Sequence, residues 1–121
     1  MKSRQNEIRQ GDIWLINFEP TKGDEMKKIR PAVVVNGDFA TGLDLKIVVP
    51  VTSWRNDFSK IWWLFKLIPD KNNKLDAVSA VNCLQIRCVS DTRFIKRLGT
   101  VERDALEEII AIMQNCIEIT G

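Results

Sequence analysis

The feature that most constrains the fold of this chain is a change in the spacing of its apolar residues near residue 100. Before that point, short runs rich in Val, Ile, Leu, Phe and Trp alternate with turn residues, a pattern typical of all-β domains. The expected strands are residues 12–18, 31–36, 46–52, 61–68, 77–90 (one or two strands) and 94–98. Pro31 opens the second run, and Pro50 lies inside the third, where proline predicts an edge strand or a bulge.

From Glu102 onward the apolar residues recur every three or four positions, which is the spacing of an amphipathic helix. We expect Thr100 to cap this helix, with acidic residues stabilising the positive end of its dipole. The two patterns together predict a mainly β domain over residues 1–121, with a small, strongly bent antiparallel sheet closed by one C-terminal helix. Residues 1–10 are expected to form a loose lead-in. Periodicity alone does not distinguish a barrel from a sandwich.

Composition excludes several kinds of chemistry. The chain has 121 residues, 45% of them hydrophobic, which fits one folded domain. It has no histidine, so a histidine base, a histidine metal ligand and a Ser-His-Asp triad are all excluded. No clustering of acidic residues or cysteines predicts a metal site, and we expect neither a metal nor another cofactor.

Three features predict a cytoplasmic protein. The three cysteines are odd in number and lack CxxC spacing, so we interpret Cys83, Cys88 and Cys116 as small apolar fillers in a reducing compartment. No apolar stretch approaches the length of about 20 residues that a membrane span needs. The first ten residues are polar and carry no apolar core of a secretory signal.

Charge is unevenly distributed along the chain. Residues 84–103 hold five basic and two acidic side chains, a net charge of 5 − 2 = +3, whereas residues 104–121 hold four acidic side chains and no basic one, a net charge of −4. A basic segment beside an acidic helix permits a face that binds polyanions. The alternative is an ordinary solvated surface with local ion pairs.

The segment from residue 19 to residue 30 is a long charged loop between the first two expected strands. It contains Gly23 and several basic residues, a composition suited to close approach of a phosphate backbone. A polar loop of this length in so small a domain is more often functional than structural. The alternative is a flexible hairpin loop without a role.

Several blocks along the chain resemble, in order and spacing, those of the MazF/PemK toxins, which include the Kid toxins. The blocks are Gly11-Asp12-Ile13-Trp14, Phe18-Glu19-Pro20, Gly23-Asp24-Glu25, Arg30-Pro31 with its apolar strand, Pro50-Val51-Thr52-Ser53, Leu84-Gln85-Ile86-Arg87 and Gly99-Thr100-Val101. The resemblance extends from about Gln10 to Ile119.

This resemblance implies a fold and an activity. The fold is an SH3-like barrel with a C-terminal helix, assembled as a homodimer. The activity is metal-independent cleavage of single-stranded RNA by attack of the ribose 2′-OH, which leaves a 2′,3′-cyclic phosphate and a 5′-OH. As the toxin of a type II toxin–antitoxin system, the protein would be neutralised by a cognate antitoxin.

The residues that match the catalytic pair of the family are Arg30 and Thr52. A guanidinium offers bidentate donors to phosphate, and a threonine hydroxyl can donate to a non-bridging oxygen. Structural alternatives are an ion pair of Arg30 with Glu25 or Asp12, and an ordinary strand-end role for Thr52. Asp24 or Glu25 is the candidate base.

Further candidates for RNA binding lie in three segments: Lys22, Gly23, Asp24, Glu25 and Lys28; Ser53, Trp54 and Arg55; Gln85 and Arg87. We expect Trp54 either to stack on a base or to pack in the core. Gln85 and Arg87 are predicted to share one face of a strand. Trp62 and Trp63 are predicted to face opposite sides of a strand.

Two rival functions remain open from the sequence. The gyrase-poisoning toxins that resemble CcdB use the same fold to bind a protein target without catalysis. An inactive barrel that binds nucleic acid is the third possibility. The pairing of Arg30 with Thr52 speaks against the CcdB-like alternative, because a protein binder has no need of it.

Overall fold

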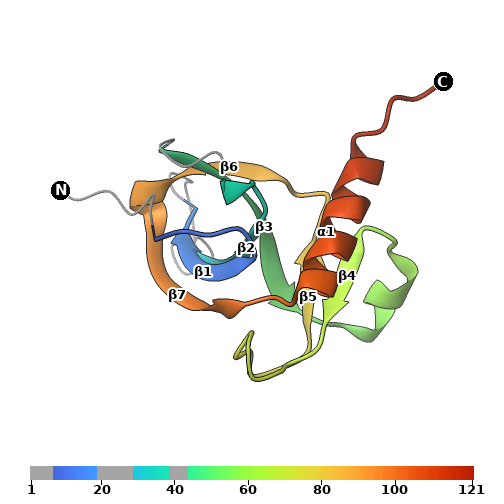
Figure 1. Cartoon of the computed structure of the whole chain (residues 1–121). Helices are drawn as coiled ribbons and strands as arrows, with labels where there is room; N and C mark the ends of the chain where they lie inside the picture. Colours follow the sequence, from blue (N-terminus) through green and yellow to red (C-terminus); the bar gives the residue numbers. More distant parts are fainter. Residues whose placement is uncertain (1–6, 19–28, 39–43) are drawn as a thin grey trace.

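The structure, a computed structural model, describes residues 7–18, 29–38 and 44–121. These residues form a bent sheet of seven strands followed by one long helix (Figure 1). The strands are β1 (Asp12–Asn17), β2 (Ile29–Val34), β3 (Leu45–Ser53), β4 (Leu64–Leu67), β5 (Ser79–Asn82), β6 (Arg87–Ser90) and β7 (Phe94–Thr100). The helix α1 spans Arg103–Cys116, and 3-10 helices span Asn56–Lys60 (η3) and Asp91–Arg93 (η4). The predicted change from strand to helical spacing near residue 100 is confirmed.

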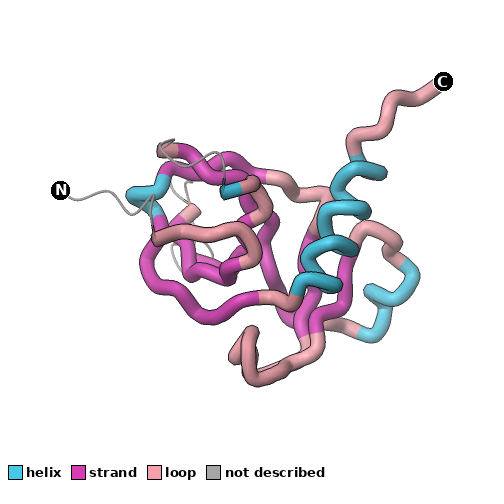
Figure 2. Tube along the Cα trace, viewed as in Figure 1, coloured by secondary structure: helices cyan, strands magenta, loops and turns pink. Residues whose placement is uncertain are grey.

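The long strand β3 organises the sheet because it changes partners along its length. Its first part pairs with β6, its middle with β2 and its last part with β5, all antiparallel. The strand order is β4-β5-β3-β2-β1-β7, with β6 paired to β3 beside this path. Figure 2 shows how strongly the strand path curls. Among the described strands β4 and β7 are not paired with each other, so the sheet is barrel-like but open.

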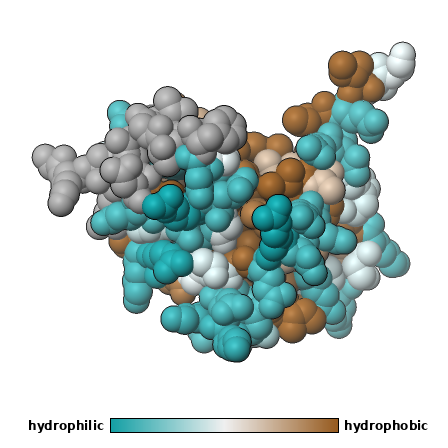
Figure 3. All heavy atoms as spheres, in the orientation of Figure 1, coloured by the Kyte–Doolittle hydropathy of each residue, from teal (hydrophilic) through white to brown (hydrophobic). Residues whose placement is uncertain are grey.

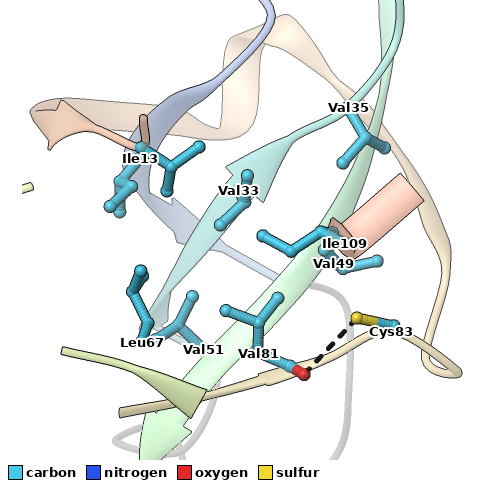
Figure 4. Packing of buried hydrophobic residues seen from close by; sticks show 10 residues of the cluster. Ile13, Val33, Val35, Val49, Val51, Leu67, Val81, Cys83 and Ile109 are labelled. Carbon is cyan, nitrogen blue, oxygen red and sulfur yellow. Dashed lines mark hydrogen bonds between the residues drawn. The ribbon is translucent and has the colours of Figure 1, made fainter. Parts of the chain in front are cut away.

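One face of the sheet packs against α1. Alternate residues of the strands, among them Val33, Val49 and Val81, form a buried cluster with Ile109 of the helix (Figure 4). Ile109 is fully buried. This is the apolar stripe that the spacing of three to four residues predicted, and it fixes the helix across the sheet.

The other face of the sheet has its own apolar cluster. Trp14 and Phe94 meet edge to face with ring centroids 5.6 Å apart, and Ile8 is buried beside the same cluster. Gln10 also ties the lead-in to the domain, because its backbone N–H donates to Asp38 Oδ1 (2.8 Å) and its Nε2 donates to the carbonyl of Val35 (2.9 Å). The prediction of a loose lead-in is therefore wrong for residues 7–10. Burial of Ile8 and the hydrogen bonds of Gln10 attach this segment to the domain.

Two proline expectations need correction. Pro50 predicted an edge strand or a bulge, and the edge is ruled out because β3 is an interior strand. Pro50 pairs with Ala32 of β2, and on its other side the pairing is interrupted between the last residue paired with β6 and the first paired with β5. Proline is accommodated there because no β5 or β6 residue is paired with it on that side. Pro31 is the third residue of β2 and not the first, since β2 begins at Ile29.

The fourth strand is shorter than predicted. β4 begins at Leu64, and Trp62 and Trp63 lie in the turn before it, where their rings contact each other edge to face at 5.7 Å. The prediction that they face opposite sides of a strand is wrong. The backbone hydrogen bond from Leu64 N–H to the carbonyl of Ile61 makes this turn.

The start of α1 also differs from the prediction. Glu102 is the N-cap residue, and its side chain makes no capping hydrogen bond. Thr100 belongs to β7, where it pairs with Asp12 of β1, and its N–H donates to the carbonyl of Asn72 in a turn (3.0 Å). Pairing with the sheet thus takes precedence over a capping role.

Candidate functional site

The site is created where β2 and β3 separate. These strands are paired from Val34–Val48 to Ala32–Pro50, and beyond this pair β3 continues its pairing with β5 on its opposite edge. Pro31, the next residue of β2 beyond this pair, has no backbone N–H to donate to a continued ladder. A hollow of about 350 Å³ opens beside the separated strands.

Arg30 and Thr52 both line this hollow. The lining residues are Ile29, Arg30, Pro31, Val51, Thr52, Ser53, Leu75 and Ser79. Continuing the β2–β3 register by two residues beyond Ala32–Pro50 sets Arg30 opposite Thr52. Side chains alternate along strands, so Arg30 and Thr52 lie on one face of the sheet and Pro31 and Val51 on the other. Both are exposed, so the structure brings the two candidate catalytic residues together at an accessible edge.

The chemistry available at this edge is phosphate binding. A guanidinium supplies five N–H donors and does not lose its proton in proteins, and a threonine hydroxyl adds one O–H donor. Ser53, also exposed, adds a second hydroxyl at the end of β3. Among the described residues there is no group of three or more His, Cys, Asp or Glu side chains that could hold a metal ion.

The structure also tests the structural alternative for Arg30 at Asp12. The Asp12 carboxylate is buried and accepts hydrogen bonds from the Arg9 N–H (2.9 Å) and Trp14 Nε1 (3.1 Å). Arg97 Nε lies 3.2 Å from its other oxygen. Asp12 is thus a structural carboxylate that joins β1 to β7.

Trp54 and Arg55 follow β3 directly and form a small cluster with η3. The Trp54 ring meets Phe58 edge to face at 5.8 Å, and the Lys66 ammonium lies 5.2 Å from the Trp54 ring centroid. Arg55 lies over the Phe58 ring at 5.6 Å and pairs with Asp57 at 3.4 Å. Trp54 is half-buried, so packing accounts for a large part of its surface.

Gln85 and Arg87 do not share a strand face as predicted. Gln85 lies in the turn between β5 and β6, where its N–H and Oε1 both interact with the Asn82 side chain (3.3 and 3.4 Å). Arg87 is on β6, opposite Val48, with its guanidinium 5.1 Å from the Phe18 ring centroid. The Asn82 side chain stabilises a turn, and this turn takes residues 83–86 out of the sheet.

The predicted loop residues Lys22, Gly23, Asp24, Glu25 and Lys28 lie outside the described residues.

Lys66 was not among the residues predicted from the sequence. Cross-strand pairing joins Lys66 to Ala80 and Ala80 to Thr52, so Lys66 lies on the same sheet face as the candidate catalytic pair. The available signal was the single charged residue inside the apolar run 61–68. Its significance depends on strand pairing, which the run itself does not reveal.

This chain resembles known proteins in both sequence and fold. The sequence pattern of the PemK-like, MazF-like toxins of type II toxin–antitoxin systems matches residues 9–117. The chain is 29% identical over 108 residues to "Endoribonuclease MazF9" of Mycobacterium tuberculosis (strain ATCC 25618 / H37Rv), an alignment that covers 84% of this chain and 89% of that protein.

Solved structures show the same fold. An endoribonuclease in complex with its cognate antitoxin, from a mycobacterial species, has a TM-score of 0.72 at 15% identity and covers 91% of this chain and 94% of that chain. MazF from Deinococcus radiodurans has a TM-score of 0.69 at 24% identity, with 89% of this chain and 94% of that chain covered.

Within the described residues, no helix is long and apolar enough to cross a membrane.

Proposed function

The chain belongs to the PemK-like, MazF-like toxins of type II toxin–antitoxin systems and is a MazF-type endoribonuclease, and from this premise we propose that it cleaves single-stranded RNA without a metal ion, using Arg30 and Thr52. The observation that carries the proposal is the position of these two residues on one exposed face where β2 and β3 separate. The predicted family resemblance and the predicted fold class are both confirmed.

The reaction needs no external nucleophile. The ribose 2′-OH loses its proton to solvent or a base as its oxygen bonds to the adjacent phosphorus, the bond to the 5′ oxygen breaks, and that oxygen takes up a proton. The products are a 2′,3′-cyclic phosphate and a 5′-OH. The protein therefore has to align the 2′-OH with the leaving oxygen and to stabilise the extra charge on the phosphate in the transition state. Arg30 supplies permanent positive charge for the phosphate oxygens, and Thr52 supplies a hydroxyl donor.

We also propose a cytoplasmic homodimer that a cognate antitoxin neutralises. Several large apolar side chains are exposed on the single chain, including Trp62 at 57% and Ile68 at 59%, and apolar atoms reach the surface in the view of Figure 3. Contiguous apolar patches mark interfaces between proteins, and contact with a second copy would remove these side chains from water. The similar mycobacterial endoribonuclease was solved in complex with its cognate antitoxin, which supports such a partner here.

Incubation of the purified protein with a long single-stranded RNA in EDTA tests the proposed function. We expect discrete cleavage with 5′-OH ends that polynucleotide kinase labels directly. A strict need for Mg²⁺, or 5′-phosphate ends, would contradict the mechanism. Binding without cleavage would instead indicate an inactive RNA-binding domain, and the absence of both would indicate a CcdB-like toxin that binds a protein.

A further inference from the structure

A row of side chains crosses four strands on the face that carries the candidate catalytic pair. Lys66 of β4 pairs with Ala80 of β5, and Ala80 pairs with Thr52 of β3. The β2–β3 register, continued past its last pair, adds Arg30 to the same row. Residues paired across an antiparallel sheet point to the same side, so Lys66 and Thr52 share a face.

Ala80 lies between the polar members of this row and adds no polar or charged group to it. Ala80 contributes only a methyl group and is fully buried, whereas Lys66 and Thr52 on either side are exposed. Neighbouring strands lie about 4.8 Å apart, so β4 is about 10 Å from β3 along the row. A chain of phosphates that crosses the sheet in this direction passes Arg30 and Thr52 and then reaches Lys66.

Trp54 holds the Lys66 ammonium in place. The ammonium lies 5.2 Å from the indole centroid, a cation–π distance, and the indole is fixed by Phe58 and by a backbone hydrogen bond from Trp54 N–H to the carbonyl of Val78 (3.1 Å). A lysine that is already oriented loses less side-chain entropy when it binds a ligand.

Within residues 7–18, 29–38 and 44–121, no neighbouring carboxylate neutralises the charge of Lys66. No described acidic residue forms an ion pair with it, whereas Arg55, Arg97 and Arg103 pair with Asp57, Asp12 and Glu107. An oriented ammonium over an apolar ring, without a counter-ion from the described residues, is suited to an anionic ligand.

We infer that Lys66 is a positioning residue that binds an RNA phosphate flanking the one that is cut, and that Trp54 serves as its support. This inference rests on the proposed ribonuclease function. It assigns to Trp54 a role different from base stacking, because the Lys66 ammonium lies over its ring.

The test uses a single-stranded RNA oligonucleotide that contains a mapped wild-type cut site. For binding, a 2′-deoxy sugar at that site removes the nucleophile and prevents cleavage. The variants are Lys66→Gln, Lys66→Arg and Trp54→Leu, with Lys71→Gln as the matched control, since Lys71 is exposed and lies in the turn after Asp70, outside the row. Thermal unfolding of each variant checks that the fold is intact.

The expected readout is a change in salt dependence. Each phosphate contact on single-stranded RNA contributes about 0.7 to the slope of log K against log salt concentration, so Lys66→Gln should reduce the slope by about that amount. We expect KM to rise about five- to tenfold at low salt and kcat to stay near the wild-type value. Lys66→Arg should keep the wild-type salt slope and KM, and Lys71→Gln should leave the slope and KM unchanged.

The outcomes separate this inference from the proposed function. If the wild-type protein cuts RNA and Lys66→Gln has the wild-type slope and KM, the inference fails and the ribonuclease function stands. A large loss of kcat with KM unchanged would place Lys66 at the cut phosphate and would overturn the flanking position. Loss of affinity in Trp54→Leu with the slope unchanged would show base stacking and overturn the role of Trp54. A wild-type protein that cuts no RNA refutes the proposed function itself.

Discussion

Arg30 and Thr52 lie opposite each other in the continued register of β2 and β3, two residues beyond Ala32 and Pro50, the last paired residues of these strands. Both strands are otherwise fixed by their neighbours, since Arg30 pairs with Ile16 of β1 and Thr52 with Ala80 of β5. The sheet thus positions the backbones of both residues, and both line the same hollow. A preorganised arrangement of this kind is what stabilisation of a transition state requires.

Substitution of either residue should remove catalysis without unfolding the protein. Arg30→Ala and Thr52→Ala each delete a donor to the phosphate, and loss of one such donor typically lowers the rate about 10²- to 10³-fold. Both side chains are exposed, so thermal unfolding should change little. Single-turnover cleavage of a labelled RNA measures the effect, with Thr52→Ser as the variant that keeps the hydroxyl. Wild-type rates in both alanine variants would show that the site lies elsewhere.

The antitoxin should compete with RNA for one binding surface, which includes the hollow beside Arg30 and Thr52. We expect an antitoxin with an acidic, extended segment, because such a segment mimics the charge of RNA and folds along a large surface on binding. Charge removal at Arg30, Arg55 or Arg87 should then weaken both ligands together, and more strongly at low salt. Titration of the toxin–RNA complex with an antitoxin fragment measures this, and RNA affinity that stays unchanged at saturation would refute a shared surface.

Glycine is required at residue 99 for a steric reason. A Cβ added there would lie 2.5 Å from the carbonyl oxygen of Asn73 and 2.6 Å from that of Asn72, both backbone atoms. We expect Gly99→Ala to destabilise the protein by about 1–3 kcal/mol, as overpacking does. Urea unfolding measures the change, with Gln114→Ala on the exposed face of α1 as the control. Equal stability of the Gly99→Ala variant and the wild type would contradict this packing.

The three cysteines should differ in reactivity. Burial, with a smaller contribution from the nearby Cys116, raises the pKa of the Cys83 thiol from its ordinary value of 9.0 to about 12, although a hydrogen bond from the Phe65 backbone opposes the shift. Cys88 is exposed, so the prediction that all three cysteines are apolar fillers is wrong for this one. Because thiolate is the reactive form, iodoacetamide at pH 8 should modify Cys88 and spare Cys83 in the native protein, as mass spectrometry of peptides would show. Rapid labelling of Cys83 would contradict its burial.

The same shift predicts a loss of stability in alkaline solution. The folded state keeps the Cys83 proton at pH values where the unfolded state has lost it, between about 9 and about 12. The unfolded state therefore binds fewer protons in this window, and the free energy of unfolding falls as pH rises. Cys83→Ala should remove this part of the pH dependence. Urea unfolding at pH 8 and pH 10.5 compares the two proteins, and identical slopes would refute the assignment to Cys83.

The sequence by itself determined the order of elements and the candidate residues. Strand and helix spacing are local properties of the chain, so the runs of β1, β2, β3 and β7 and the amphipathic face of α1 could be predicted from neighbouring residues alone. The motif around Arg30 and the absence of histidine are also visible without a structure. Together they favour a mechanism in which the protein stabilises charge on the phosphate and uses no histidine base.

Only the tertiary structure decided which residues meet. Register between strands distant in sequence is set by packing on both faces of the sheet, so the change of partner along β3 and the gap beside Arg30 could not be predicted. The same holds for Gln85, which Asn82 holds in a turn, and for the pairing of Asp12 with Arg97. Lys66 lies on the functional face because β4 pairs with β5, and β5 pairs with β3 beside Thr52. These pairings depend on contacts that no local sequence pattern contains.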